Sequence, residues 1–210
     1  MHPDGRQLDQ DIIMKPLDTP DSHYLSAAIG WLGLGMRAEA TQELRKITPH
    51  NAAHPDVLEV LWHIHAKTGQ WTDCLNIAEV IIELDPERAF GWIHRAFALY
   101  ELRRTQEAYD RLLPVAKRFP TLWKIPYALA CYCAQLGRFI EAQLWLRKAM
   151  AINREIVRRI AVTDPNLQPL WVSMRSKNAP PELLGDMGST ARVPAAGKSV
   201  LLSVSSKRMP

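Results

Sequence analysis

A period of 34 residues constrains this chain more than any other feature of its sequence. Gly35, Gly69 and Gly137 are separated by 34 and then 68 residues, and Arg103 stands at the skipped position. Five residues after each of these four positions comes a small side chain that directly follows an acidic one: Glu39-Ala40, Asp73-Cys74, Glu107-Ala108 and Glu141-Ala142. Self-similarity at a fixed period of this length is the signature of a repeat architecture.

Each repeat is predicted to contain two helices. In the third repeat, apolar residues recur at three- and four-residue steps in two runs. The first run stops at Arg103-Arg104-Thr105 and consists of Phe90, Ile93, Ala96, Phe97 and Tyr100. The second run ends at Phe119-Pro120 and consists of Ala108, Leu112, Val115 and Ala116. The glycines would lie in the turn between the helices, where a left-handed backbone costs them little. The small residue lets the two helices approach closely. Because neither helix is long enough to be stable alone, the repeats must stack.

The spacing resembles that of the tetratricopeptide repeat (TPR) family, with units at 21–54, 55–88, 89–122 and 123–153. The third unit carries the family pattern best, at Trp92, Arg95-Ala96, Leu99, Ala108, Leu112 and Pro120. The sequence departs from the pattern at Trp62, where the family has a small residue, at His65, where it has tyrosine, and at Pro126, where it has an aromatic. The resemblance implies an all-α protein, a right-handed α-solenoid whose first helices line a concave inner side.

The ends of the chain are predicted to differ from the repeats. Residues 1–20 form an N-terminal extension. Residues 154–175 contain two short apolar helical patterns that would cap the exposed edge of the solenoid. Residues 176–210 are rich in Pro, Gly, Ser and Ala without a period, which is typical of a disordered tail.

Charge and composition narrow the function classes. From Val172 onward there are six basic and two acidic residues, so this end carries the whole net charge of +4 and the preceding part sums to zero. A neutral body argues against nucleic-acid binding. Three irregularly spaced cysteines favour a reducing compartment, and no apolar run is long enough for a signal peptide or a membrane helix. We therefore expect a cytoplasmic protein.

The inner face is predicted to bind a protein or peptide partner, because the residues that the family places there are apolar and aromatic in the centre. An apolar groove can anchor side chains of an extended or helical segment. The alternative for each residue is a role in the core. The predicted partner-binding residues are His63, Phe90, Ile93, Phe97, Tyr100, Lys124, Tyr127 and Cys131. The Lys, Asn and Arg clamp by which one branch of the family grips a C-terminal carboxylate is missing.

Catalytic, metal and cofactor sites are not predicted. His63 and His65, like Cys131 and Cys133, are two residues apart, so helical geometry points their side chains in different directions. No phosphate-binding loop or nucleophile motif occurs. The leading hypothesis is a non-enzymatic adaptor or chaperone-like scaffold without a cofactor. The alternatives are a structural subunit that self-associates through a repeat end or residues 200–204, and RNA binding through the basic tail. The sequence leaves the oligomeric state open.

Overall fold

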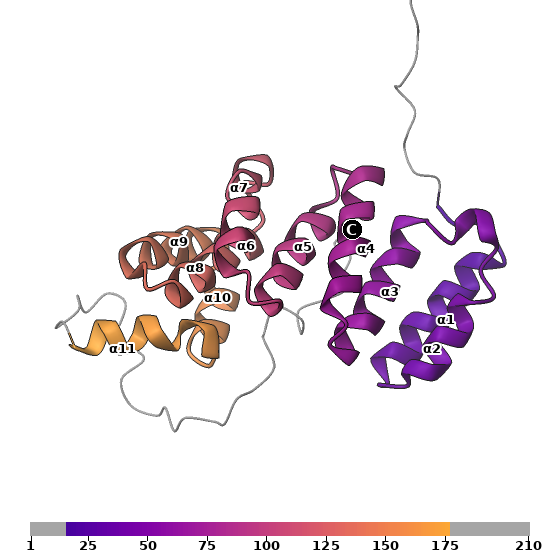
Figure 1. Ribbon diagram of the computed structural model, residues 1–210, viewed down its shortest axis with the longest axis horizontal. Helices are drawn as coiled ribbons and strands as arrows, with labels where there is room; N and C mark the ends of the chain where they lie inside the picture. Colours follow the sequence, from indigo (N-terminus) through magenta and orange to yellow (C-terminus); the bar gives the residue numbers. More distant parts are fainter. Residues whose placement is uncertain (1–15, 177–210) are drawn as a thin grey trace, which may run out of the picture. The chain divides into compact units, whose positions relative to one another are not determined.

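The computed structural model describes residues 16–176, which are helical and include no strand (Figure 1). This confirms the all-α prediction. The predicted tail, from residue 177, and residues 1–15 of the predicted extension lie outside the described residues. The chain divides into two compact units between Arg88 and Ala89, which is also the boundary between the second and third predicted repeats. We refer to residues 16–88 as unit 1 and residues 89–176 as unit 2.

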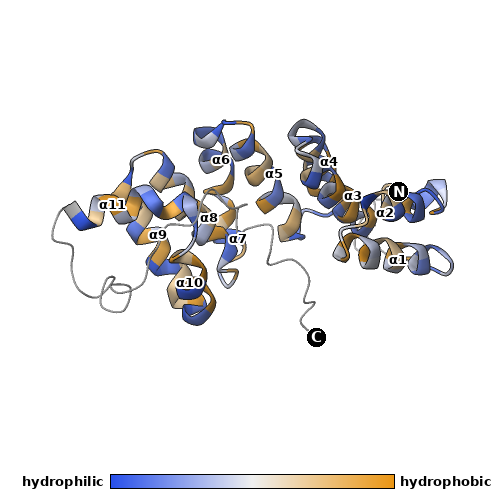
Figure 2. Ribbon diagram, turned by 90° about the horizontal axis from the view of Figure 1, so that it is seen from below, coloured by the Kyte–Doolittle hydropathy of each residue, from blue (hydrophilic) through white to orange (hydrophobic). Residues whose placement is uncertain are grey.

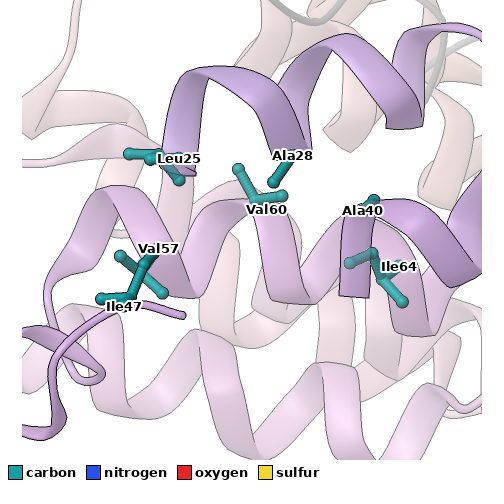
Figure 3. Packing of buried hydrophobic residues seen from close by; sticks show 7 residues of the cluster. All are labelled: Leu25, Ala28, Ala40, Ile47, Val57, Val60 and Ile64. Atoms are coloured by element: carbon teal, nitrogen blue, oxygen red, sulfur yellow. The ribbon is translucent and has the colours of Figure 1, made fainter. Parts of the chain in front are cut away.

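Unit 1 consists of two antiparallel helix pairs joined by a short 3-10 helix. Its elements are α1 (Asp21–Gly33), α2 (Arg37–Leu44), η1 (Pro49–Asn51), α3 (Pro55–Thr68) and α4 (Trp71–Leu84). An apolar cluster joins the first pair to α3: Leu25, Ala28, Ala40, Ile47, Val57, Val60 and Ile64 (Figure 3). Burial of this cluster holds helices together that would each be marginal in water.

Unit 2 contains two further helix pairs and a C-terminal addition. Its elements are α5 (Ala89–Glu101), α6 (Thr105–Leu112), α7 (Val115–Arg118), α8 (Lys124–Gln135), α9 (Phe139–Ile152), α10 (Arg154–Ala161), η2 (Pro165–Leu167) and α11 (Gln168–Ser176). The second helix of the third predicted repeat is interrupted at Leu113-Pro114 and continues as α7. Proline lacks the amide hydrogen that a continuous helix needs, so the run expected through Ala116 is broken.

The turn inside each pair has the same left-handed geometry at all four repeat positions. Gly35, Gly69 and Gly137 have φ of 81°, 74° and 73°, and Arg103 has φ of 63°. At each turn this residue donates to the carbonyl three residues earlier, and the next amide donates to the carbonyl five residues before itself. These are the two bonds of a Schellman motif. The prediction of a left-handed backbone at the glycines is confirmed.

Arg103 is the one non-glycine residue with positive φ in the described part of the chain, and Arg103→Gly is expected to stabilise the protein. A left-handed conformation costs an ordinary residue roughly 1–2 kcal/mol, and glycine recovers part of this despite its freer unfolded state, so the expected gain is about 1 kcal/mol. Urea unfolding followed by circular dichroism measures it. Gly137→Ala is the matched reverse change. A Cβ at Gly137 would meet nothing within 4 Å, so a loss of stability there reports backbone strain alone.

The small residues of the repeat lie in the interior of the helix pairs. Ala40, Cys74, Ala108 and Ala142 are all fully buried. The acidic residue before each of them lies in the first turn of its helix, where a negative charge interacts favourably with the helix dipole. The three repeated positions therefore mark one structural unit. It consists of a left-handed turn, an acidic residue at the helix start and a buried small residue.

A buried carboxylate fastens the start of α1 to the loop after α2. Asp21 accepts hydrogen bonds from the Thr48 amide at 3.1 Å, from the Thr48 hydroxyl, and from the Asn51 side-chain amide at 2.8 Å. The bonds from the Thr48 hydroxyl and from Asn51 lower the pKa of Asp21 below its ordinary value. The ionised carboxylate is thus the form that the fold favours.

Asp21→Ala is expected to lower the melting temperature of the protein near neutral pH. Because the pKa of Asp21 is lower in the folded state, its contribution is complete above the unfolded pKa of about 4 and disappears as the pH falls through the folded value. Thermal unfolding of the wild type and the variant should therefore converge in acid. Asp18→Ala changes an exposed carboxylate nearby and serves as the control. A difference between wild type and Asp21→Ala that persists unchanged in acid would contradict the assignment.

Candidate functional site

The first helices of unit 2, α5 and α8, carry seven of the eight predicted partner-binding residues. Four of these are buried: Ile93, Phe97, Tyr127 and Cys131. The other three are partly exposed: Phe90, Tyr100 and Lys124. The eighth, His63, lies partly exposed on α3 of unit 1, with its ring edge-on to Trp62 at 5.3 Å between centroids. The face formed by α5 and α8 is called the inner face of unit 2.

The reason for the burial of Tyr127 and Cys131 is a segment from the same chain. After α10, the chain turns at Asp164 and forms η2 against α8, and α11 then runs beside α8 and α9 (Figure 1). The Tyr127 hydroxyl donates to Asp164 Oδ2 at 2.7 Å, and Cys131 Sγ lies 3.8 Å from the same oxygen. The predicted cap therefore lies partly on the inner face. We call residues 164–167 the inner segment.

Asn166 is the second polar anchor of the inner segment. The Tyr100 hydroxyl donates to Asn166 Oδ1 at 2.6 Å, and Gln135 Nε2 donates to the backbone oxygen of Asn166 at 2.8 Å. Leu167 is fully buried. The inner face of unit 2 thus holds a short 3-10 helical segment through two tyrosine hydroxyls, one amide and an apolar contact surface.

Neutral donors hold the carboxylate of Asp164. It is fully buried, and its other oxygen accepts from the Asn166 amide at 2.9 Å, which closes a tight turn. Burial raises the pKa of Tyr127 well above its ordinary value, and the nearby Cys131 and Asp164 act in the same direction. Burial also raises the pKa of Cys131. Both groups remain protonated at neutral pH and can donate to the carboxylate.

The inner face has a partly exposed edge at the start of α5. The Phe90 ring stacks on His94 with 3.7 Å between centroids, and His94 Nδ1 lies 2.9 Å from the Phe90 carbonyl oxygen. Burial raises the pKa of Tyr100, further along α5, to about 12, and the Glu101 carboxylate adds to this shift. The ring of Tyr100 stacks on Tyr132 at 5.4 Å. These rings give the edge an aromatic character.

Two of the corresponding positions of unit 1, Asp56 and Glu59, are charged. Arg88 Nη1 lies 2.7 Å from Asp56 and 2.8 Å from Glu59, and its Nε lies 3.2 Å from Asp85. Although burial by itself lowers the pKa of Arg88, the hydrogen bonds to Asp56 and Glu59 raise it above its ordinary value. This ion cluster fixes the end of unit 1 to α3. The inner positions of the two units therefore have different chemistry.

Sequence reasoning did not identify Asp164, Asn166 and Gln135 as part of the site. Asp164-Pro165 has the local sequence of a helix start, and the side chain of Asp164 does accept from the Asn166 amide at such a start. The same carboxylate also contacts α8, 33 and 37 residues earlier in the chain. No local sequence signal distinguishes a carboxylate that only caps a helix from one that also contacts a distant helix.

The described residues provide no cluster of metal-ligating side chains. His65 Nδ1 instead lies 2.8 Å from Gln70 Oε1, at the turn between α3 and α4. Cys74, Cys131 and Cys133 are free and buried. Between residues 16 and 176, no helix is sufficiently long and apolar to cross a membrane.

Comparisons with known proteins support the fold. No family model matches the sequence, and no curated protein matches it. Among solved structures, MamA (41-end) from Desulfovibrio magneticus RS-1 aligns with a TM-score of 0.61 and 15% identity, over 81% of this chain and 92% of that chain. A thermophilic TPR protein from Thermus thermophilus aligns with a TM-score of 0.61 and 19% identity, over 73% of this chain and 82% of that chain. These structural alignments, at identities of 15% and 19%, establish a shared fold. By fold the chain is a tetratricopeptide-like repeat protein.

Proposed function

We propose that the protein is a non-enzymatic interaction scaffold that holds a short polypeptide segment of a partner against the inner face of unit 2. The observation that carries the proposal is that this face already holds a short segment of its own chain, through Tyr100, Tyr127 and Gln135. A partner segment with a carboxylate, an amide and an apolar side chain in similar positions would replace the inner segment. Phe90, Ile93, Phe97, Lys124 and Cys131 complete the proposed binding face, and His63 belongs to the equivalent face of unit 1.

The chemistry of the face favours a polypeptide over a small ion. Its donors are two phenol hydroxyls and a carboxamide, each of which pairs with a carboxylate, an amide or a backbone oxygen of the inner segment. Aromatic anchors with a polar tip are typical of protein interfaces. The three free buried thiols support a reducing compartment, and we propose that the scaffold acts in the cytoplasm as an adaptor or in a chaperone-like role.

A peptide with the sequence of residues 162–175, labelled with fluorescein, tests the binding face. It is added to the full chain and to the full-chain variant Asp164→Ala/Leu167→Ala. The inner segment of this variant has lost the polar anchor Asp164 and the apolar anchor Leu167. We expect the variant to bind the peptide at least about ten-fold more tightly, because the competing internal segment is weakened. Fluorescence anisotropy measures the affinity, and a scrambled peptide is the control. Absence of binding above the scrambled peptide in both proteins would contradict the proposal.

Tyr100→Phe in the same variant locates the peptide on the face. Loss of the hydroxyl that bonds to Asn166 should weaken peptide binding about five-fold, which corresponds to a hydrogen bond of about 1 kcal/mol. Tyr24→Phe removes a hydroxyl from unit 1 and should leave the affinity unchanged. Circular dichroism confirms that each variant keeps its helix content.

A further inference from the structure

The zero net charge of residues 1–171 hides a strong separation of charge between the two units. Residues 16–88 contain eleven acidic and five basic residues, a net charge of −6. Residues 89–176 contain fourteen basic and six acidic residues, a net charge of +8. The chain therefore carries an acidic unit followed by a basic unit, and this separation requires its own explanation.

Part of the charge of each unit lies on equivalent helices. Helices α4 and α9 each have 14 residues, and each residue of α9 stands 68 residues, or two repeats, after its counterpart in α4. The exposed position of Glu79 in α4 corresponds to that of Arg147 in α9, and Val80 corresponds to Lys148. At these two exposed positions α4 has a glutamate and a valine, whereas α9 has an arginine and a lysine.

The acidic face is the exposed stripe of α4. It consists of Glu79 and Glu83, four residues apart, beside Val80 and Leu84, which are 39% and 37% exposed. Asp73, at the start of the same helix, is 52% exposed in its side chain. Like charges at this spacing on a helix repel each other. Among residues 16–176 neither Glu79 nor Glu83 has an ion-pair partner, so nothing in the described part of the chain compensates this repulsion.

The basic face begins on α9 and continues into α10. On α9, exposed Arg147 and Lys148 lie beside Leu144, which is 51% exposed, and Ile152, which is 38% exposed. Arg154 follows two residues later and lines a shallow surface depression together with Glu155, Arg158 and Arg159. Figure 2 shows α10 as a helix with both hydrophobic and hydrophilic residues; its apolar residues Val157 and Ile160 are buried.

We propose that copies of this protein associate head to tail, with the acidic face of one copy against the basic face of the next. Glutamates pair with arginines and lysine across the contact, and the exposed Val80 and Leu84 meet Leu144 and Ile152, which adds apolar burial to the attraction. In a dimer one copy keeps a free basic face and the other keeps a free acidic face, so association continues beyond a dimer until a ring closes. This inference goes beyond the proposed peptide binding and does not depend on it.

Sedimentation of the full chain at increasing concentration and two salt levels tests the inference. We expect the average mass to rise with protein concentration at about 0.1 M salt and to return to that of the monomer at about 1 M, because the screening length falls from about 10 Å to about 3 Å. A monomer at every concentration in the lower salt would overturn it. So would an association that strengthens in the higher salt.

Charge reversal identifies the two faces. Glu79→Lys/Glu83→Lys makes both faces basic, and Arg147→Glu/Arg154→Glu cancels the net charge of the basic face, so each variant alone should remain monomeric. An equimolar mixture of the two variants should associate in pairs, because the unchanged basic face of the first variant meets the unchanged acidic face of the second. Persistent association of either variant, or failure of the mixture to associate, would overturn the proposal.

Two control variants test whether association depends on charges at the two faces or on the net charge of the protein. Arg45→Glu/Lys117→Glu changes the net charge as much as Arg147→Glu/Arg154→Glu does, at exposed cations outside both faces, and should leave association intact. Glu79→Gln/Glu83→Gln replaces the two carboxylates by neutral side chains of the same size. It should weaken association without adding the repulsion that the lysine variant introduces. Circular dichroism verifies the helix content of all variants.

Discussion

Tyr127→Phe is expected to lower the free energy of unfolding of unit 2 by about 2 kcal/mol, because a buried hydrogen bond to an ionised group contributes roughly 1.5–3 kcal/mol. Tyr127 is fully buried, and its hydroxyl donates to Asp164 at 2.7 Å. The variant leaves the Asp164 carboxylate in the interior with one strong donor fewer. Urea unfolding of the full chain, followed by circular dichroism, measures the loss.

Tyr132→Phe is the matched control on the same helix. Tyr132 is 1% exposed, and its hydroxyl has no hydrogen-bond partner among the described residues. Removal of this hydroxyl should leave the stability unchanged or raise it by up to about 1 kcal/mol, since a buried unpaired polar group is unfavourable. Equal losses for the two variants would contradict the role assigned to the Tyr127–Asp164 bond. In an Asp164→Ala background, Tyr127→Phe should have little effect.

The repeat fold is the part that the sequence predicts well, because each element of the pattern has a local physical cause. A residue with φ near 75° is most stable as glycine, and three of the four turns have one. A close helix contact requires a small side chain, and all four predicted positions are fully buried. Arg103 shows why the pattern tolerates exceptions: the two turn hydrogen bonds form there as well, at the cost of local strain.

The contact between the inner segment and α8 could not be predicted from the sequence. Whether Asp164 faces solvent or Tyr127 depends on how the chain returns after α10, and residues 37 positions apart carry no local signal of their contact. Tyr100 and Asn166, which are 66 residues apart, also come together because of how the chain returns after α10. The resemblance to the repeat family predicts that Tyr100 and Tyr127 are inner residues. It does not show that part of the same chain covers them.

The charge of the two units shows a different limit of sequence reasoning. The charges of residues 1–171 sum to zero, which argues against nucleic-acid binding, whereas the structural division at Arg88 separates residues 16–176 into an acidic and a basic unit. The boundary that makes the separation visible comes from packing. Glu79 and Arg147 become comparable only when α4 and α9 are recognised as equivalent helices.

Trp62→Ala is expected to lower the free energy of unfolding of unit 1 by about 3–5 kcal/mol, the usual cost of truncating a buried tryptophan. Trp62 is fully buried on α3, at the repeat position where the other repeats have Ala28, Ala96 and Ala130. The substitution therefore brings the sequence closer to the repeat pattern and yet should destabilise the protein. Thermal and urea unfolding of the full chain measure the change.

The reciprocal substitution Ala96→Trp completes the argument. Ala96 is also fully buried, on α5 of unit 2, where the surrounding side chains leave room for a methyl group. A large ring there should destabilise unit 2 by about 1–3 kcal/mol or more through overpacking. If stability followed the repeat pattern, Trp62→Ala would be favourable and only Ala96→Trp would be harmful. We expect both to be harmful, because the indole of Trp62 is fully buried and its removal leaves a cavity in a closely packed interior.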